Sequence, residues 1–156
     1  MLKNYVMVIQ LLLLDQRSQM MFCLSLKFHL STSQMFVNSD FPEEKSFPKI
    51  PKHPKASKIK LGYYSADFHN HATSYLMAEM FELHDRSKFE VIGFSFGPDL
   101  DDEMRRRVSK SFDKFIDVRL KSNNEIVNLS REMGIDIAVD LKGFTKDMRL
   151  GIFAKR

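Results

Sequence analysis

The sequence predicts an α/β fold in which the strands of a parallel sheet alternate with helices. Two observations support this prediction. From residue 59 onward, short runs rich in apolar residues alternate with longer segments of helical periodicity. The run "VIGFSF" (91–96) is apolar almost throughout, which is typical of a central strand covered on both faces.

Four strands are predicted, at 59–65, 89–96, 112–118 and 135–141. Each is followed by a predicted helix, at 71–85, 101–110, 122–133 and 146–156. Local signals fix several ends: Ser122 and Glu125 form a capping box, Gly134 ends that helix, and Thr145 can cap the last one. The alternation implies right-handed crossovers and a Rossmann-like sheet in the order third, second, first, fourth. A fifth strand would be expected after residue 156.

Three zones divide the chain. Residues 1–40 are rich in Leu, Met and Phe without a clean period, and this unassigned extension is expected to be irregular or helical. Within it, 5–14 is too short to span a bilayer and is predicted to be a helix buried on a neighbouring element. Residues 41–58 form a linker rich in Pro and Lys, and 59–156 form the predicted lobe.

The composition limits the classes of protein. The chain has 156 residues, of which 44% are hydrophobic and 28% charged, with a net charge of +4. A single cysteine, Cys23, excludes an internal disulfide framework and a cysteine-based zinc cage, and it favours a cytoplasmic location. A nucleic acid is not expected as a partner, because no basic stripe is interleaved with aromatic residues. A membrane is not expected either, because no apolar run is long enough to span a bilayer. Binding of nucleic acid through the lysines of the linker stays open as an alternative.

The predicted topology places a site at one edge of the sheet. In open α/β sheets, ligands bind outside the carboxyl ends of the strands, where the strand order reverses. The loops "SADFHNHATS" (65–74) and "KGFT" (142–145) follow the first and fourth strands, so they are expected to face each other. Neither loop has the glycine pattern that cradles a phosphate, so side chains must hold the ligand. Of the two acids of the fourth strand, Asp140 lies nearer this edge than Asp136.

Two segments carry a family resemblance. They are "GYYSADFHNHATSYLMAEMFELHDRSKFEVIGFSFGP" (62–98) and "IDIAVDLKGFTKDMRLGIFA" (135–154). They resemble the SPINDLY and O-GlcNAc transferase family of glycosyltransferases, in its bacterial form, and the similarity extends over about 41–156. The most specific pattern is D-F-x-N-H-x-T-S, formed by Asp67, Phe68, Asn70, His71, Thr73 and Ser74.

The resemblance implies half of a two-lobed, B-type inverting glycosyltransferase. Such enzymes transfer N-acetylglucosamine from UDP-GlcNAc to Ser or Thr hydroxyls of proteins, without a metal ion or other cofactor. It implies that His71 is catalytic and lies near donor and acceptor, where a role as base has been proposed for the matching histidine, since an imidazole can accept a proton near neutral pH. The residues expected to contact substrate are Asp67, Asn70, Thr73, Lys142, Gly143 and Thr145. Plainer interpretations stay open: helix or turn caps for Asp67, Asn70 and Thr73, and a solvated lysine for Lys142.

Some features depart from the family pattern. Tyr75 stands where animal members tend to have a histidine, and residues 1–40 show none of the tetratricopeptide repeats that usually come before this region. The chain is expected to be a truncated piece that transfers no sugar alone, with Leu150, Ile152 and Phe153 and the sheet edge beside the fourth strand left uncovered.

The sugar can be GlcNAc or fucose. The alternative function is a non-catalytic α/β binding or regulatory module.

Overall fold

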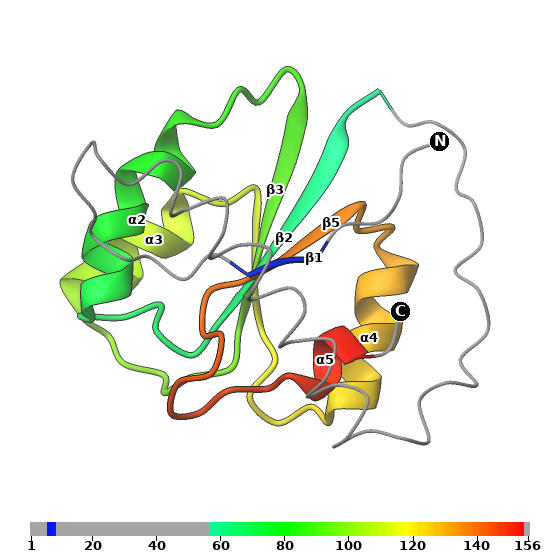
Figure 1. The fold of residues 1–156 in the computed structure, drawn as a ribbon. Helices are drawn as coiled ribbons and strands as arrows, with labels where there is room; N and C mark the ends of the chain where they lie inside the picture. Colours follow the sequence, from blue (N-terminus) through cyan, green and yellow to red (C-terminus); the bar gives the residue numbers. More distant parts are fainter. Residues whose placement is uncertain (1–5, 9–56, 155–156) are drawn as a thin grey trace, which may run out of the picture.

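The computed structural model describes residues 6–8 and 57–154 (Figure 1). Its strands are β1 (Val6–Val8), β2 (Ile59–Ser65), β3 (Phe89–Ser95), β4 (Lys114–Asp117) and β5 (Ile137–Asp140). Its helices are α2 (Ala72–Leu83), α3 (Glu103–Lys110), α4 (Asn123–Glu132) and α5 (Gly151–Ala154). Among these residues, no helix is both long and apolar enough to cross a membrane.

The strands form one parallel sheet in the order β1-β5-β2-β3-β4. This order confirms the predicted arrangement of the four strands from residue 59 onward. Helices α2 and α3 cover one face of the sheet and α4 and α5 cover the other, which gives three layers (Figure 1). Because all strands run the same way, their carboxyl ends share one edge.

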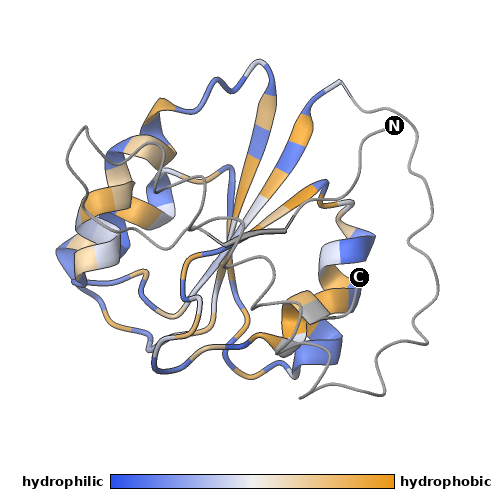
Figure 2. Cartoon of the chain, in the orientation of Figure 1, coloured by the Kyte–Doolittle hydropathy of each residue, from blue (hydrophilic) through white to orange (hydrophobic). Residues whose placement is uncertain are grey.

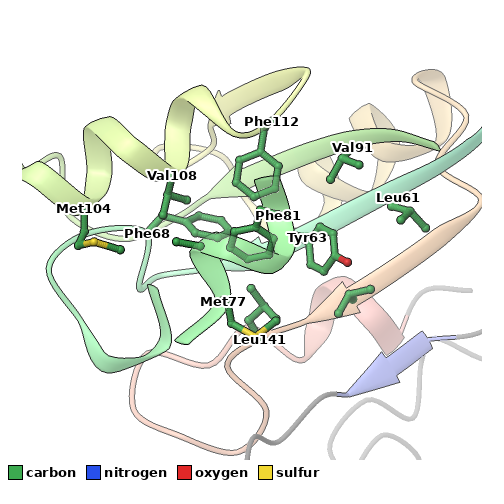
Figure 3. Close-up of a cluster of buried hydrophobic side chains, with 12 residues drawn as sticks. Leu61, Tyr63, Phe68, Met77, Phe81, Val91, Met104, Val108, Phe112 and Leu141 are labelled. Carbon is green, nitrogen blue, oxygen red and sulfur yellow. The ribbon is translucent and has the colours of Figure 1, made fainter. Parts of the chain in front are cut away.

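The core between the sheet and α2–α3 is built from aromatic rings. Phe81 and Phe112 have ring centroids 4.9 Å apart, and Tyr63 meets Phe81 edge-on at 5.0 Å. Phe68, from the loop after β2, packs edge-on against Phe112 at 5.4 Å (Figure 3). Since Phe68 is almost fully buried, it anchors the loop that carries the predicted site to this core.

A second core lies between the sheet and α4–α5. Tyr64 stacks on Phe94 with ring centroids 4.4 Å apart, and Phe153 of α5 meets Tyr64 edge-on at 5.3 Å. Ile126 of α4 is fully buried in the same cluster. The alternation of Tyr63 and Tyr64 between the two cores shows that β2 is covered on both faces. Figure 2 shows hydrophobic residues recurring along the strands and on the helices that cover them.

Several predicted helix ends are confirmed. The Ser122 side chain accepts a hydrogen bond from the backbone of Glu125, and the Glu125 carboxylate accepts one from the Ser122 backbone N–H. Gly134 follows α4 with φ of 69°, a left-handed conformation that glycine adopts without strain. The Asp102 side chain accepts from Arg105 N–H and starts α3. These ends rest on neighbours in sequence, so local patterns predict them.

The structure corrects the prediction for the N-terminal segment. Val6–Val8 form a strand that pairs with β5, in the register Val6↔Ala138 to Val8↔Asp140, and not a helix. The edge of β5 is therefore covered, because β1 occupies the backbone groups that an edge strand leaves unpaired. The other residues of 1–40 and most of the predicted linker lie outside the described residues.

The last predicted helix is also corrected. A helix starting after Thr145 was expected, but α5 begins only at Gly151. Asp147 has φ of 64°, which lies outside the helical region, so the chain turns before the helix starts. Ile152 and Phe153 are then buried against the sheet and Leu150 is half-buried, so the expected exposed apolar end is not found.

Candidate functional site

The loops that follow β2 and β5 meet at the carboxyl edge of the sheet. β2 and β5 are neighbours, with Tyr64 opposite Asp140 at their ends. Beyond this pair, Lys142 Nζ lies 2.8 Å from Asp67 Oδ2 and 3.0 Å from Asp67 Oδ1. The Lys142 and Asp67 side chains are only 6% and 10% exposed. The prediction that the two loops face each other is therefore confirmed.

This ion pair distinguishes between the interpretations of Lys142. A solvated lysine is excluded, because the ammonium group is buried and paired with a carboxylate. A buried ion pair adds little net stability over an apolar pair of the same size, but removing one partner leaves an uncompensated charge. Lys142 and Asp67 thus hold the two loops in register, and a direct contact of either with substrate stays a prediction.

His71 stands beside this pair, at the start of α2. It is the N-cap residue, and its Nδ1 accepts the backbone N–H of Thr73 at 3.2 Å. Nδ1 lies 3.2 Å from Thr73 Oγ1 and 3.6 Å from Asp67 Oδ2. The His69 ring is 5.7 Å away, centroid to centroid, and 42% of the His71 side chain is exposed. His71 therefore combines a capping contact through Nδ1 with a partly exposed side chain.

Asn70 joins the β2 loop to the start of α3. Its Oδ1 accepts the backbone N–H of Met104 at 3.2 Å, and its own backbone N–H donates to Asp102 Oδ2 at 2.9 Å. The Tyr75 hydroxyl donates to the same Oδ1 at 3.4 Å. Asn70 thus serves as a capping link between elements, and substrate binding by its amide nitrogen stays a prediction.

The "KGFT" loop is a tight turn. Thr145 Oγ1 donates to the carbonyl of Lys142 at 2.8 Å, so this hydroxyl closes the turn. Gly143 has φ of 53°, a left-handed conformation that favours glycine, and it is buried. Both residues shape the loop that delivers Lys142 to Asp67. Their predicted role in substrate binding is neither supported nor opposed by these contacts.

Asp140, at the end of β5, is the most deeply buried charged residue among those described, at 1% exposed. Its Oδ1 accepts the backbone N–H of Lys142 at 2.9 Å, whereas its Oδ2 has no hydrogen-bond partner among the described residues. Burial raises the pKa of the Asp140 carboxyl to about 6, although backbone N–H groups and the Lys142 charge act in the opposite direction. This strand end therefore holds a carboxyl group that is easily protonated.

Arg105 is a site neighbour that the sequence does not reveal. Three consecutive arginines, 105–107, predict a solvated surface, but the Arg105 side chain is only 11% exposed. It donates to Ser95 Oγ at 3.2 Å and to the Phe68 carbonyl at 3.4 Å, and it pairs with Asp99 at 3.0 Å. Arg105 thus ties the ends of β2 and β3 together. Nothing in the sequence distinguishes Arg105 from Arg106 and Arg107. Its nearness to the site depends on how α3 lies over the strand ends.

Near this edge, the described residues form a hollow but no metal-binding group. A shallow hollow beside α3 is lined by Asp99, Leu100, Asp101, Arg105, Arg106 and Ser109. It lies over the loop after β3 and not over the loops of β2 and β5. Within the described part of the chain, no three His, Cys, Asp or Glu residues are grouped so that they could hold a metal ion.

The fold and the site define a class of protein. It is an α/β protein with a Rossmann-like lobe in which two strand-end loops meet at the carboxyl edge of the sheet, without a glycine-rich phosphate cradle. The sequence profile of Glycosyl transferase family 41 matches residues 37–156. The chain belongs to this family, which confirms the resemblance to the SPINDLY and O-GlcNAc transferase group.

Individual relatives agree with this assignment. A probable UDP-N-acetylglucosamine–peptide N-acetylglucosaminyltransferase SEC of Arabidopsis thaliana is 34% identical over 97 residues, which is 62% of this chain and 10% of that protein. The corresponding transferase of Caenorhabditis elegans is 32% identical and shares 64% of this chain and 9% of its own length. The chain therefore spans about a tenth of the length of the curated relatives it matches.

A solved structure is also similar. It is a mutant of the O-GlcNAc transferase of Thermobaculum terrenum, with 33% sequence identity and a TM-score of 0.64. The match covers 70% of this chain and 21% of that one. It supports the expected α/β lobe as part of a larger catalytic protein in that relative.

Proposed function

We propose that residues 59–154 form the N-terminal lobe of the catalytic region of a protein O-linked N-acetylglucosaminyltransferase. The whole enzyme would transfer GlcNAc from UDP-GlcNAc to Ser or Thr hydroxyls of a protein. The observation that carries the proposal is the buried Lys142–Asp67 ion pair, which joins the two strand-end loops beside His71. Rigid support of this kind is what a site needs to hold two substrates in reacting geometry.

The proposed reaction is an in-line displacement at the anomeric carbon. A bond forms between the acceptor oxygen and the anomeric carbon, and the bond from that carbon to the UDP oxygen breaks. The proton of the acceptor hydroxyl is released to water, and UDP leaves with the electron pair of the broken bond. Catalysis would then rest on positioning of the two substrates and on stabilisation of the leaving diphosphate.

Other parts of the proposal do not rest on the ion pair. The relatives' names give UDP-N-acetylglucosamine as donor and a peptide as acceptor. A metal-free reaction, a cytoplasmic location and GlcNAc as the sugar in preference to fucose are predictions for this protein. His71, Asp67, Asn70, Thr73, Lys142, Gly143 and Thr145 are its proposed substrate-facing residues.

A segment exchange tests the proposed function. The segment of the Thermobaculum terrenum enzyme that aligns with residues 59–154 is replaced by this chain's residues, and transfer to an acceptor peptide is measured with UDP-GlcNAc and with a nucleotide-activated fucose. We expect transfer from UDP-GlcNAc, and a loss of at least about tenfold on His71→Ala, equal to roughly 1.4 kcal/mol of transition-state stabilisation.

The thermal unfolding of the exchanged enzyme serves as its control. An enzyme that folds with an unchanged melting temperature but transfers neither sugar would contradict the proposal and favour a non-catalytic binding module. Transfer of fucose alone would keep the lobe assignment and replace the sugar.

A further inference from the structure

The hydrogen bonds of His71 determine which of its ring nitrogens carries the proton. The backbone N–H of Thr73 points at Nδ1 from 3.2 Å, and a backbone N–H can only donate. Nδ1 must therefore offer its lone pair. Because a neutral imidazole has one N–H and one free nitrogen, the proton then lies on Nε2.

A proton on Nδ1, with Nε2 free, would need a hydrogen-bond acceptor such as a carboxylate beside Nδ1. In a catalytic His–Asp pair, the carboxylate accepts Nδ1–H and leaves Nε2 free to take a proton from the reacting group. Asp67 is the carboxylate nearest to Nδ1, but its Oδ2 is 3.6 Å away, which is too long for a hydrogen bond. Both Asp67 oxygens are instead bound by Lys142, at 2.8 and 3.0 Å.

We propose that neutral His71 presents Nε2–H as a hydrogen-bond donor to an oxygen of the bound ligand, and does not act as the base that its family resemblance implies. An oxygen of a diphosphate or of a sugar would be its acceptor, so the identity of the ligand rests on the proposed function. The His71 side chain is 42% exposed, which leaves it within reach of a ligand. Lys142 has an indirect role, because it keeps the Asp67 carboxylate from drawing the proton to Nδ1.

Nitrogen NMR of the chain itself tests the position of the proton. The chain is labelled with ¹⁵N-histidine and studied at about pH 8.5, where an ordinary imidazole is neutral. The His71 signals are identified by their loss in His71→Asn. We expect Nδ1 to show the shift of an unprotonated ring nitrogen and Nε2 that of a protonated one. A protonated Nδ1 would overturn the proposal, and this result does not depend on any enzymatic activity.

A pair of substitutions in the exchanged enzyme tests the ligand contact. Asn places an oxygen near the position of Nδ1 and keeps the cap, whereas Gln places an N–H group near the position of Nε2 and keeps the donor. We expect His71→Gln to retain at least about tenfold more transfer than His71→Asn. Equal loss in both variants would indicate a base, and full activity of His71→Asn would indicate a cap alone; either result would overturn the proposal.

The transfer assay and the NMR measurement can fail independently of each other. An exchanged enzyme without any transfer would refute the proposed function, while the NMR measurement would still decide where the His71 proton lies. Thr73→Val is the matched control for the NMR experiment. It removes the hydroxyl near Nδ1 but keeps the backbone N–H, so we expect the same pattern of ring-nitrogen shifts as in the unchanged chain.

Discussion

At the scale of single residues, His71 shows how far a local pattern can lead. Its place after a strand and before a helix follows from the sequence, because both elements have clear periodicity. Its hydrogen bonds do not follow, since they depend on how Lys142, distant in sequence, reaches Asp67. The family resemblance singled out this residue as a site candidate, whereas the hydrogen-bonding role of each ring nitrogen required the structure.

The capping contact of His71 predicts a small effect on stability. His71→Ala removes the acceptor for the Thr73 N–H, and loss of an N-cap costs about 1 kcal/mol. His71→Asn restores an acceptor at the same place, so we expect its free energy of unfolding to equal that of the unchanged chain or to exceed it. Urea unfolding of the three proteins measures this. Equal stability of the Ala and Asn variants would show that the cap contributes nothing.

Asp140 predicts an unusual dependence of stability on pH. Its pKa is raised from the ordinary 3.8 to about 6 by burial, so the folded state favours the protonated form. The stabilising contribution is complete below about pH 3.8 and is lost as pH rises through about 6. A shift of roughly two units corresponds to about 3 kcal/mol.

Asp140→Asn removes this titration. We expect the free energy of unfolding of the unchanged chain, relative to the variant, to fall between about pH 4 and pH 7 by up to about 3 kcal/mol. Since the amide does not titrate, any constant cost of the substitution cancels from the comparison. Parallel pH profiles of the two proteins would mean that Asp140 is not forced toward its protonated form.

At the scale of elements, the features set by contacts between near neighbours in sequence were predicted, and those set by distant contacts were not. The capping box of α4 and the turn at Gly134 were predicted because their contacts lie within a few residues. The start of α5 was not, because it comes after a left-handed residue, Asp147, and carries Ile152 and Phe153 into a core formed by distant elements. The strand β1 was missed for a similar reason: a three-residue strand gives almost no periodic signal, and its pairing with β5 spans most of the chain.

The contact between the two strand-end loops predicts a large loss of stability on Lys142→Met. The substitution leaves the Asp67 carboxylate buried without its partner, which costs roughly 3–5 kcal/mol in comparable pairs. Lys146 lies in the same segment but is exposed, so Lys146→Met should change stability by less than about 0.5 kcal/mol. Urea unfolding compares the two variants. If both substitutions had the same small effect, the ion pair would not hold the loops together.

At the scale of the whole described structure, the alternation of strands and helices predicted the sheet order once the common Rossmann order was assumed. Right-handed crossovers leave few topologies for four parallel strands, and the same topology gives the edge where a ligand is expected to bind. Which residues of the edge touch a ligand was less accessible. Thr145 and Asn70 were both expected to contact substrate, but the side-chain oxygen of Thr145 closes a turn and that of Asn70 binds the start of a helix. Arg105 comes near the edge only because α3 packs there.

We propose that the donor substrate binds where the loops after β2 and β5 meet. Backbone amide NMR of the ¹⁵N-labelled chain, titrated with UDP-GlcNAc to millimolar concentrations, tests it most directly. We predict weak binding, with shift changes concentrated in residues 67–73 and 141–145. Changes confined to the hollow lined by Asp99, Leu100, Asp101, Arg105, Arg106 and Ser109, or no changes at all, would contradict the claim.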